Sequence, residues 1–403
     1  MIVCLPKAQG NQTPKDYRTI TLLNSDYKIL ACLIAQRLRP VLADHLTQTQ
    51  FCRVPGNTII GAVATVRDTI AYAESRRIPL CVLSLDFENA FDRIAYNNLF
   101  QTLQGYGIGN AFIASIKRMY EGATSSVQTN GHKYGPVPIR CAVRQGYPMS
   151  MVLYALCLHT LLRLLDIKLP GIRIGRRTRP TSVVAYTDDV TIFVASAADF
   201  AIIEEAIRLY QRASGARLKP RKSKALAVGS WCTQQTVLGI TYHPHVTILG
   251  VTFWGTIEQT KKGSWARLTG KVRAQAKRVY TRGPCLATRM RYVSTFLLSK
   301  IWYTAQILPV PNIHTQQLTT VITLYIWRVT DFRVPVSTIQ RLRQMGGWEM
   351  PDNEAKCTVL LLYRMYLQDQ RNGTVTAAWL QTWNLTGRQG NPPHATKFPT
   401  KLD

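Results

Sequence analysis

Three aspartates are the residues of this sequence best suited to metal chemistry. Asp86 lies near the end of the apolar run "CVLSLDF", and Asp188 and Asp189 stand in the middle of the apolar stretch "VVAYTDDVTIFVAS". The adjacent pair alone could be a simple turn, because Asp bonds the local backbone and tolerates left-handed conformations. If the two apolar segments are neighbours in one sheet, the carboxylates can converge on a pair of Mg²⁺ ions. Such ions prefer oxygen ligands and serve in-line phosphoryl transfer.

The segments around these aspartates predict a strand, a helix and a hairpin. The β-rich run predicts a strand that ends at Asp86, and "FDRIAYNNLFQTLQ" predicts a helix that starts just after it and stops at Gly105. β-branched and aromatic residues on both sides of Asp188 predict a hairpin with that residue at its tip. Together they indicate a mixed α+β layer with functional groups at the strand end.

Two further segments predict amphipathic helices. "AADFAIIEEAIRLYQRASG" predicts a helix that is capped by Ser196 with Asp199 and closed at Gly215. Another helix is predicted from about Ser25 onward. The apolar residues that we expect on one face of this helix are Ile29, Leu30, Leu33, Ile34, Leu38 and Leu42.

The composition indicates a folded protein that binds a polyanion. Among 403 residues there are 50 Lys and Arg against 22 Asp and Glu, a net charge of +28, and 46% are hydrophobic. A nucleic-acid binder has this charge excess, although a ribosomal or membrane-surface protein shares it. Nine cysteines without a C-x-x-C pair and seven histidines without a partner set indicate neither zinc nor disulfides, and a reducing compartment. "LYALCLHTLLRLL" predicts a buried helix, because it is too short for a membrane span and carries Arg and His.

Five motifs in order resemble those of a reverse transcriptase, specifically of non-LTR (LINE-type) retrotransposons. They are "LSLDFENAFDRI", "RQGYPMS", "AYTDDV", "SGARLKPRKSK" and "ILGVTF". The resemblance implies an α+β right-hand polymerase with an antiparallel palm sheet and a helical thumb. It further implies fingers at 1–78, a palm with interleaved fingers elements at 79–254, a thumb at 255–335 and a C-terminal extension at 336–403.

The resemblance also implies a metal site. Asp86 and Asp188 match the metal-binding pair of the palm, Phe87 would lend its backbone carbonyl to the second metal, and Asp189 matches the third, supporting carboxylate. The implied cofactor is two Mg²⁺ ions, with Mn²⁺ as a possible substitute.

The same resemblance assigns residues to the incoming dNTP. Lys7 and Arg18 resemble the fingers cations that hold the triphosphate, although a surface arginine is the ordinary alternative for the second. Gln145 and Gly146 match residues beside the template and the incoming base. Phe91 matches the steric gate that excludes a ribose 2′-hydroxyl, or it is an ordinary core aromatic.

Three further assignments concern the pyrophosphate and the nucleic acid. Lys222 matches a lysine near the leaving pyrophosphate, or it belongs to a solvated charge run or a localisation-like patch. Leu249 and Gly250 match the primer-grip turn. In the basic tract from 261 to 291, the cations expected on one helix face along a phosphate backbone are Arg267, Lys271 and Arg278, with Trp265 and Tyr280 interleaved.

Several positions depart from the family pattern. The motif that follows "RQG" carries Tyr147, Met149 and Met151, Asn57 stands where Arg is common, and Lys219 stands where Asn is usual. These departures indicate either a divergent active enzyme or one copy of a mobile element that has begun to decay.

We therefore expect an RNA-directed DNA polymerase that extends a primer 3′-hydroxyl with dNTPs on an RNA template during retrotransposon replication. Its expected partners are template RNA and primer or target DNA, in the nucleus or a cytoplasmic ribonucleoprotein, with no membrane. One alternative is a catalytically decayed RNA-binding remnant; another is an RNA-dependent RNA polymerase, against which Phe91 argues. We expect the chain to be a polymerase core without the N-terminal endonuclease, or a fragment of a longer protein.

Overall fold

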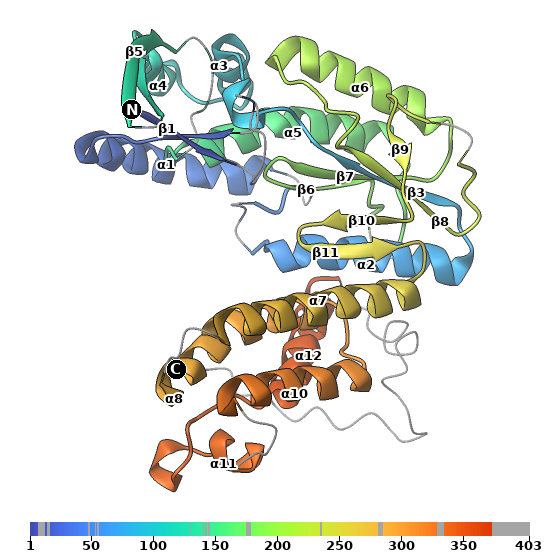
Figure 1. The fold of residues 1–403 in the computed structure, drawn as a ribbon. Helices are drawn as coiled ribbons and strands as arrows, with labels where there is room; N and C mark the ends of the chain where they lie inside the picture. The colour runs from blue at the N-terminus through green and yellow to red at the C-terminus, as the bar shows by residue number, and fades with distance from the viewer. Residues whose placement is uncertain are drawn as a thin grey trace.

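In a computed structural model of the chain, the described residues are 1–6, 13, 17–46, 49–52, 54, 56–129, 131–139, 141, 143, 146–174, 179–233, 236–280, 285–328 and 334–372. For residues 18, 279, 280, 343 and 365–372 only the backbone is described. These residues form helices and strands that lie in layers (Figure 1).

The strands belong to three sheets, ordered β2-β1-β4-β5, β6-β7-β3-β8-β9 and β10-β11. Their bounds are β1 Ile2–Pro6, β2 Tyr17–Thr21, β3 Leu80–Leu85, β4 Thr124–Thr129, β5 His132–Pro138, β6 Val183–Tyr186, β7 Asp189–Val194, β8 Lys224–Val228, β9 Thr241–Tyr242, β10 His245–Ile248 and β11 Val251–Trp254.

The longer helices cover the sheets and build a second layer at the C-terminal end. Their bounds are α1 Ser25–His45, α2 Ile59–Arg76, α3 Tyr96–Gly105, α4 Asn110–Tyr120, α5 Ser150–Lys168, α6 Asp199–Ser214, α7 Ile257–Tyr280, α8 Leu286–Tyr292, α9 Ser299–Ala305, α10 Asn312–Trp327, α11 Val336–Gln340 and α12 Asn353–Asn372.

The central five-stranded sheet is buried on both faces, which explains the apolar sequence of β3. Successive side chains of a strand point to opposite faces. Cys81, Leu83 and Leu85 pack into the cluster that contains α5 and α6, while Leu80 and Val82 pack into the cluster that contains α2. Figure 1 shows α5 and α6 on one side of this sheet and α2 on the other. All strand pairs in it are antiparallel except β8 with β9.

Helix α5 lies in the largest core. Its 19 residues make it, by length and composition alone, the single helix in the described part of the chain that could cross a membrane, so the sequence-based expectation of too short a helix was wrong. However, 67% of its apolar window is buried inside the protein. The helix packs against α3, α6 and α1, and this packing accounts for its apolar sequence.

Helix α1 packs with a different face from the one that its apolar residues predicted. Ile29, Leu30 and Leu33 are about half exposed or more, at 64%, 48% and 53%. The buried residues are Ala31, Ile34, Ala35, Leu38 and Leu42. The prediction was wrong at the N-terminal half because it counted large apolar side chains, whereas the packed face there uses alanines that allow close approach of the neighbouring elements.

Two predicted helix starts also needed correction. After Asp86 the chain makes a 3₁₀ turn at Ala90–Asp92, and α3 begins only at Tyr96, so Phe91 lies in the turn. Helix α6 begins at Asp199 and not at Ser196, although the Ser196 N–H donates to the Asp199 carboxylate at 3.2 Å. The predicted C-terminal closure is confirmed, because Gly215 adopts a left-handed conformation with φ of 78°.

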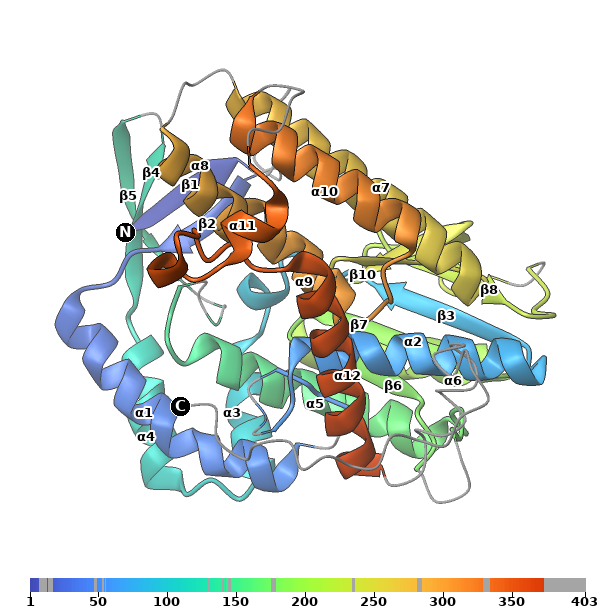
Figure 2. The same ribbon diagram turned by 90° about the horizontal axis from the view of Figure 1, so that it is seen from below.

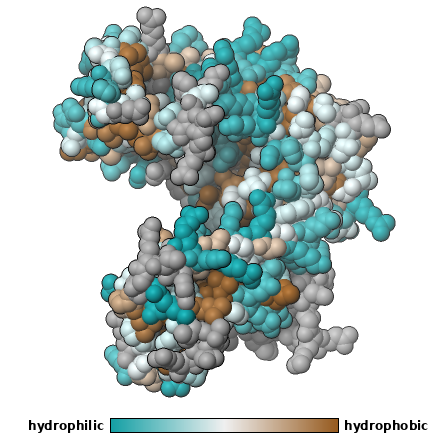
Figure 3. All heavy atoms as spheres, viewed as in Figure 1, coloured by the Kyte–Doolittle hydropathy of each residue, from teal (hydrophilic) through white to brown (hydrophobic). Residues whose placement is uncertain are grey.

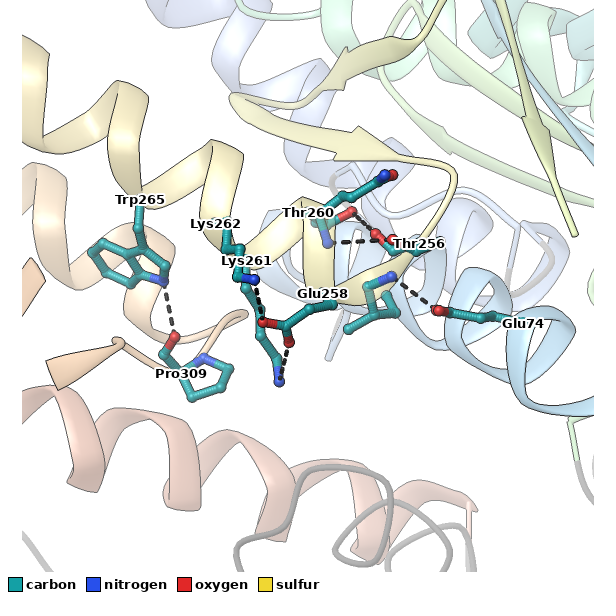
Figure 4. A network of polar contacts seen from close by, with 10 residues as sticks. Glu74, Thr256, Glu258, Thr260, Lys261, Lys262, Trp265 and Pro309 are labelled. Carbon is teal, nitrogen blue, oxygen red and sulfur yellow. Dashed lines mark hydrogen bonds and ion pairs between the residues drawn. The ribbon is translucent and has the colours of Figure 1, made fainter. Parts of the chain in front are cut away.

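The helices from α7 onward have a core of their own, and α7 is anchored to the sheet layer at its start. Glu74 of α2 accepts a hydrogen bond from the Ile257 N–H at 2.8 Å, at the N-terminus of α7 (Figure 4). Trp265 lies in that core and donates its indole N–H to the Pro309 carbonyl at 2.9 Å. Helices α7 and α10 lie side by side (Figure 2). Figure 3 shows a deep hollow between this helical layer and the part that carries α1.

Candidate active site

The sheet register brings the three aspartates to one edge. In the β3–β7 pair, Leu85 lies opposite Val190, so the next residues along the register are Asp86 and Asp189. Strands β6 and β7 are joined by a two-residue turn made of Thr187 and Asp188. The strand end and the hairpin tip are therefore neighbours, as the sequence predicted.

The three carboxylates share one electrostatic environment. The pKa of Asp189 rises to about 6, first because the surrounding protein desolvates it and then because of the charges of Asp188 and Asp86. The Asp189 side chain is nevertheless exposed to solvent at the start of β7. Gathered negative charge of this kind is costly unless a cation offsets it.

The backbone at Asp86 is fixed from the β8 side. Ser223 is 1% exposed, and its Oγ accepts the Asp86 N–H at 3.0 Å, while the Lys219 N–H donates to the Asp86 carbonyl at 2.8 Å. Consecutive carbonyls of extended backbone point to opposite edges. The Phe87 carbonyl therefore faces the edge with the hairpin, where the resemblance expected a metal ligand.

These oxygen donors fit a hard divalent cation. Among the described residues, no group of three or more His, Cys, Asp or Glu side chains stands preformed around a metal position. Mg²⁺ does not need such a cage, because it is usually held by one or two carboxylates together with substrate phosphates and water. Asp86, Asp188 and the Phe87 carbonyl are the groups that would hold it here.

Phe91 lies in a tightly connected turn that follows Asp86. Its carbonyl accepts the Val143 N–H at 2.8 Å, and the neighbouring Asp92 carboxylate accepts the Thr19 hydroxyl of β2 at 3.0 Å. The Phe91 ring is half-buried and packs on Tyr154 of α5, whose raised pKa reflects burial first and also the charges of Asp188 and Asp189. The structure thus joins strand β2, the turn that carries Phe91 and the loop before α5.

The predicted nucleotide contacts are only partly described. Lys7 and Gln145 lie outside the described residues, and for Arg18 only the backbone in β2 is described. Gly146 has φ of 90°, and a Cβ at this position would approach the Thr21 carbonyl oxygen to 3.0 Å. A glycine is therefore needed for this loop to pass close to β2.

The remaining predicted residues of this region lie on the flank of the site. Lys222 is exposed in the turn that precedes Ser223. Of the positions that depart from the family pattern, Tyr147 and Met149 are buried at 3% and 0% exposed and pack in the core. Asn57 donates its side-chain N–H to the Gln50 carbonyl at 2.9 Å. These three departures therefore have packing or hydrogen-bonding roles in this chain.

Leu249 and Gly250 form the two-residue turn between β10 and β11. Both have positive φ, at 46° and 87°. The Tyr303 hydroxyl of α9 donates to the Leu249 carbonyl at 2.5 Å. Burial, and to a smaller degree Tyr186, raises the pKa of Tyr303 to about 12, so this turn, α9 and the aspartate hairpin are close to one another.

Helix α7 exposes the three predicted cations on the face opposite its packed residues. Arg267, Lys271 and Arg278 are exposed, and their positions in a helix of 3.6 residues per turn differ by less than about 60°. Trp265, which is interleaved with these cations in the sequence, is 0% exposed and belongs to the core. The Tyr280 side chain lies outside the described part of the structure.

Three residues near these positions were not singled out from the sequence. Ser223 lies within a basic run of the sequence, Tyr154 lies within an apolar run that predicts a helix, and Tyr303 lies within an apolar segment. The one signal in the sequence was a hydroxyl group in a segment that becomes buried, because a buried polar group needs a hydrogen-bond partner. The sequence does not say which partner, since Ser223 and Asp86 are 137 residues apart.

Comparisons with known proteins show what this chain is similar to. A family model described as "Reverse transcriptase (RNA-dependent DNA polymerase)" matches residues 5–253. The chain is 37% identical over 226 residues to the "Transposon TX1 uncharacterized 149 kDa protein" of Xenopus laevis, a match that covers 56% of this chain and 17% of that protein. It is 28% identical over 193 residues to the "Retrovirus-related Pol polyprotein from type-2 retrotransposable element R2DM" of Drosophila melanogaster, covering 47% and 18%.

A third relative is the "Retrovirus-related Pol polyprotein from type-1 retrotransposable element R2" of Popillia japonica, 27% identical over 239 residues, covering 58% of this chain and 33% of that protein. The chain thus spans a third or less of the length of these relatives. Among solved structures, telomerase from Candida albicans with a fragment of telomeric RNA has a TM-score of 0.45 at 12% identity and covers 96% of this chain and 64% of that one.

Proposed function

Since the chain belongs to the reverse transcriptase (RNA-dependent DNA polymerase) family and folds as a right-hand polymerase, we propose that it extends a primer 3′-hydroxyl with dNTPs on an RNA template. The match to proteins named for transposons and retrotransposable elements confirms the expected resemblance to non-LTR reverse transcriptases. By that resemblance, we further propose a part in retrotransposon replication, in the nucleus or in a cytoplasmic ribonucleoprotein.

One observation carries the proposal: the β3–β7 register sets Asp86 against the turn that holds Asp188. Two divalent cations bound there would supply the chemistry of the step, by lowering the pKa of an attacking hydroxyl and offsetting the charge of the leaving oxygen. The groups that would hold them are Asp86, Asp188 and the Phe87 carbonyl. The raised pKa of Asp189 supports this assignment, because it reflects negative charge at this edge that a bound cation would offset.

The other residues of the chain bind and orient the reactants in this proposal. Phe91 limits the space beside the sugar, and the Leu249–Gly250 turn supports the primer end. The exposed cations of α7 hold the phosphate backbone of the template–primer duplex without reading its bases. Lys7 and Arg18 are proposed to hold the triphosphate, and Lys222 to assist the leaving pyrophosphate.

Primer extension on an RNA template, with dNTPs and rNTPs compared in parallel, tests the proposal. We expect extension that needs Mg²⁺ or Mn²⁺ and prefers dNTPs. Preferential use of rNTPs would instead identify an RNA-dependent RNA polymerase. RNA binding without extension would identify the remnant of an element, which is one of the two alternatives that the departures at Tyr147 and Met149 left open.

A further inference from the structure

A buried glutamine joins the turn that carries Asp188 to a segment far away in the sequence. Gln50 is 0% exposed and lies in the segment before α2. Its side-chain Oε1 accepts the Thr187 N–H at 3.3 Å and the Cys52 N–H at 3.0 Å. Because Thr187 directly precedes Asp188, this single side chain contacts the turn next to the candidate metal ligand.

The backbone around Gln50 is itself fixed to the hairpin. Gln50 forms an isolated parallel bridge with Ala185 of β6. The Phe51 N–H donates to the Ala185 carbonyl at 2.8 Å, and the Ala185 N–H donates to the Thr49 carbonyl at 2.7 Å. Asn57 holds the Gln50 carbonyl at 2.9 Å. The carboxamide therefore reaches the turn from a rigid base and not from a free loop.

The turn needs such support because its first residue is strained. Thr187 has φ of 59°, a left-handed conformation that is an outlier for a β-branched residue and persists only when its surroundings hold it. The β6–β7 ladder pairs Tyr186 with Asp189, so the Thr187 N–H between them needs an acceptor from elsewhere. Thr187 is 7% exposed, which limits water as that acceptor, and Gln50 supplies one.

Packing alone does not explain a glutamine at this position. The Gln50 Nε2 is buried and has no hydrogen-bond partner among the residues that the structure describes, and a buried unsatisfied donor costs stability. An apolar side chain of similar volume would avoid that cost, but it could not accept the Thr187 N–H. The useful part of the side chain is therefore its oxygen.

We propose that Gln50 is a positioning residue for Asp188. Its carboxamide oxygen holds Thr187 in the left-handed conformation and so fixes where the Asp188 carboxylate stands relative to Asp86. The catalytic consequence rests on the proposed polymerase function, whereas the hold on the turn is a property of the folded chain by itself.

Gln50→Met tests this role, because it removes the acceptor at nearly constant volume. Hydrogen exchange in overlapping peptides that cover 183–194 should show about tenfold faster exchange at the turn, while the melting temperature stays within about 3 °C of the wild type. Direct titration with Mn²⁺ should show weaker binding by about threefold or more. In primer extension, kcat should fall by about tenfold with the KM for dNTP and the RNA affinity within about twofold.

Ile60→Val is the matched control, because Ile60 is buried in the α2 cluster and is not one of the residues assigned to the candidate site. It should lower the melting temperature slightly and leave exchange at the turn and Mn²⁺ binding unchanged. Unchanged exchange and unchanged Mn²⁺ binding in Gln50→Met would overturn the proposal. Faster exchange at the turn and weaker Mn²⁺ binding in Ile60→Val, to the same extent as in Gln50→Met, would also overturn it. If Gln50→Met loosens the turn but the wild-type chain shows no primer extension, the role of Gln50 in the turn is supported and the proposed polymerase function is rejected.

Discussion

The ring of Phe91 packs on the ring of Tyr154, with ring centroids 4.6 Å apart and planes inclined by 31°. Tyr154 is 1% exposed, so the protein core supports one side of the Phe91 ring while its other edge stays half-buried. A ring held in this way cannot easily retreat from a bulkier sugar.

For Phe91→Val we expect a loss of discrimination between sugars. If the ring limits the space beside the ribose, its removal should raise the rNTP-to-dNTP efficiency ratio by more than about tenfold, equivalent to about 1.4 kcal/mol. A packing role would lower both efficiencies together, with a loss of stability of up to about 3 to 5 kcal/mol. Kinetics with both nucleotides and a melting curve distinguish these outcomes, and an unchanged ratio in a folded, active variant would exclude the gate.

For Tyr303→Phe we expect weaker use of the primer. The variant loses only the hydroxyl that donates to the Leu249 carbonyl, so stability should fall by about 1 kcal/mol. The KM for primer–template should rise by about threefold or more, because the β10–β11 turn loses its support from α9. Tyr363→Phe, an exposed tyrosine on α12, is the control. An unchanged KM for primer–template would contradict the assignment of the Leu249 turn to the primer.

Neutralising Arg267, Lys271 and Arg278 together should weaken binding to the template–primer duplex and flatten its salt dependence. Each lost phosphate contact reduces the slope of log K against log salt by about 0.7 to 0.9. Binding titrations over a range of salt concentrations measure this slope.

The control for this experiment removes the same net charge from exposed positions elsewhere, at Arg39, Lys168 and Arg212. Its slope should stay close to that of the wild type. Equal slopes for the two triple variants would show that the exposed face of α7 has no special contact with nucleic acid.

His159 makes stability depend on pH. Burial, followed by the charge of Arg163, lowers the pKa of His159 to about 4, while Asp166 opposes and His45 adds to the shift. The neutral ring is 1% exposed and hydrogen-bonded to the Tyr106 hydroxyl. Because the unfolded chain takes up the proton near pH 6.5, stability is full above that pH and is lost as the pH falls toward 4.

Urea unfolding should therefore show a loss of about 2 kcal/mol between pH 7 and pH 5 from this residue. His159→Gln keeps a side chain that can bond to Tyr106 but does not titrate, so the variant should lose less stability over that range. Parallel pH profiles for the variant and the wild type would contradict the assignment.

The parts of the site that could be predicted from sequence are those encoded locally. The strand before Asp86 and the hairpin around Asp188 follow from short apolar runs that need no distant partner to be identified. Gly146 and the Leu249–Gly250 turn were assigned by the family resemblance, and all three residues have positive φ in the structure.

The parts that could not be predicted depend on distant partners. Gln50 and Ser223 are polar residues whose importance arises only when the fold brings them to residues 137 positions away. The packed face of α1 was predicted wrongly because Ala31 and Ala35 face the core while larger apolar residues face outward. The proposed domain boundaries, the cofactor and the nucleotide contacts of Lys7, Arg18 and Gln145 stay predictions.

The most direct test of the central claim is Mg²⁺-dependent primer extension on an RNA template by the wild type and by Asp188→Asn, with RNA affinity measured on the same samples. The substitution removes a carboxylate from the edge where Asp86 and the hairpin meet, but it removes no phosphate contact. We expect extension by the wild type, a loss of at least about 100-fold in the variant and RNA affinity within about twofold. Substantial extension by Asp188→Asn would contradict the assignment of this edge as the metal site.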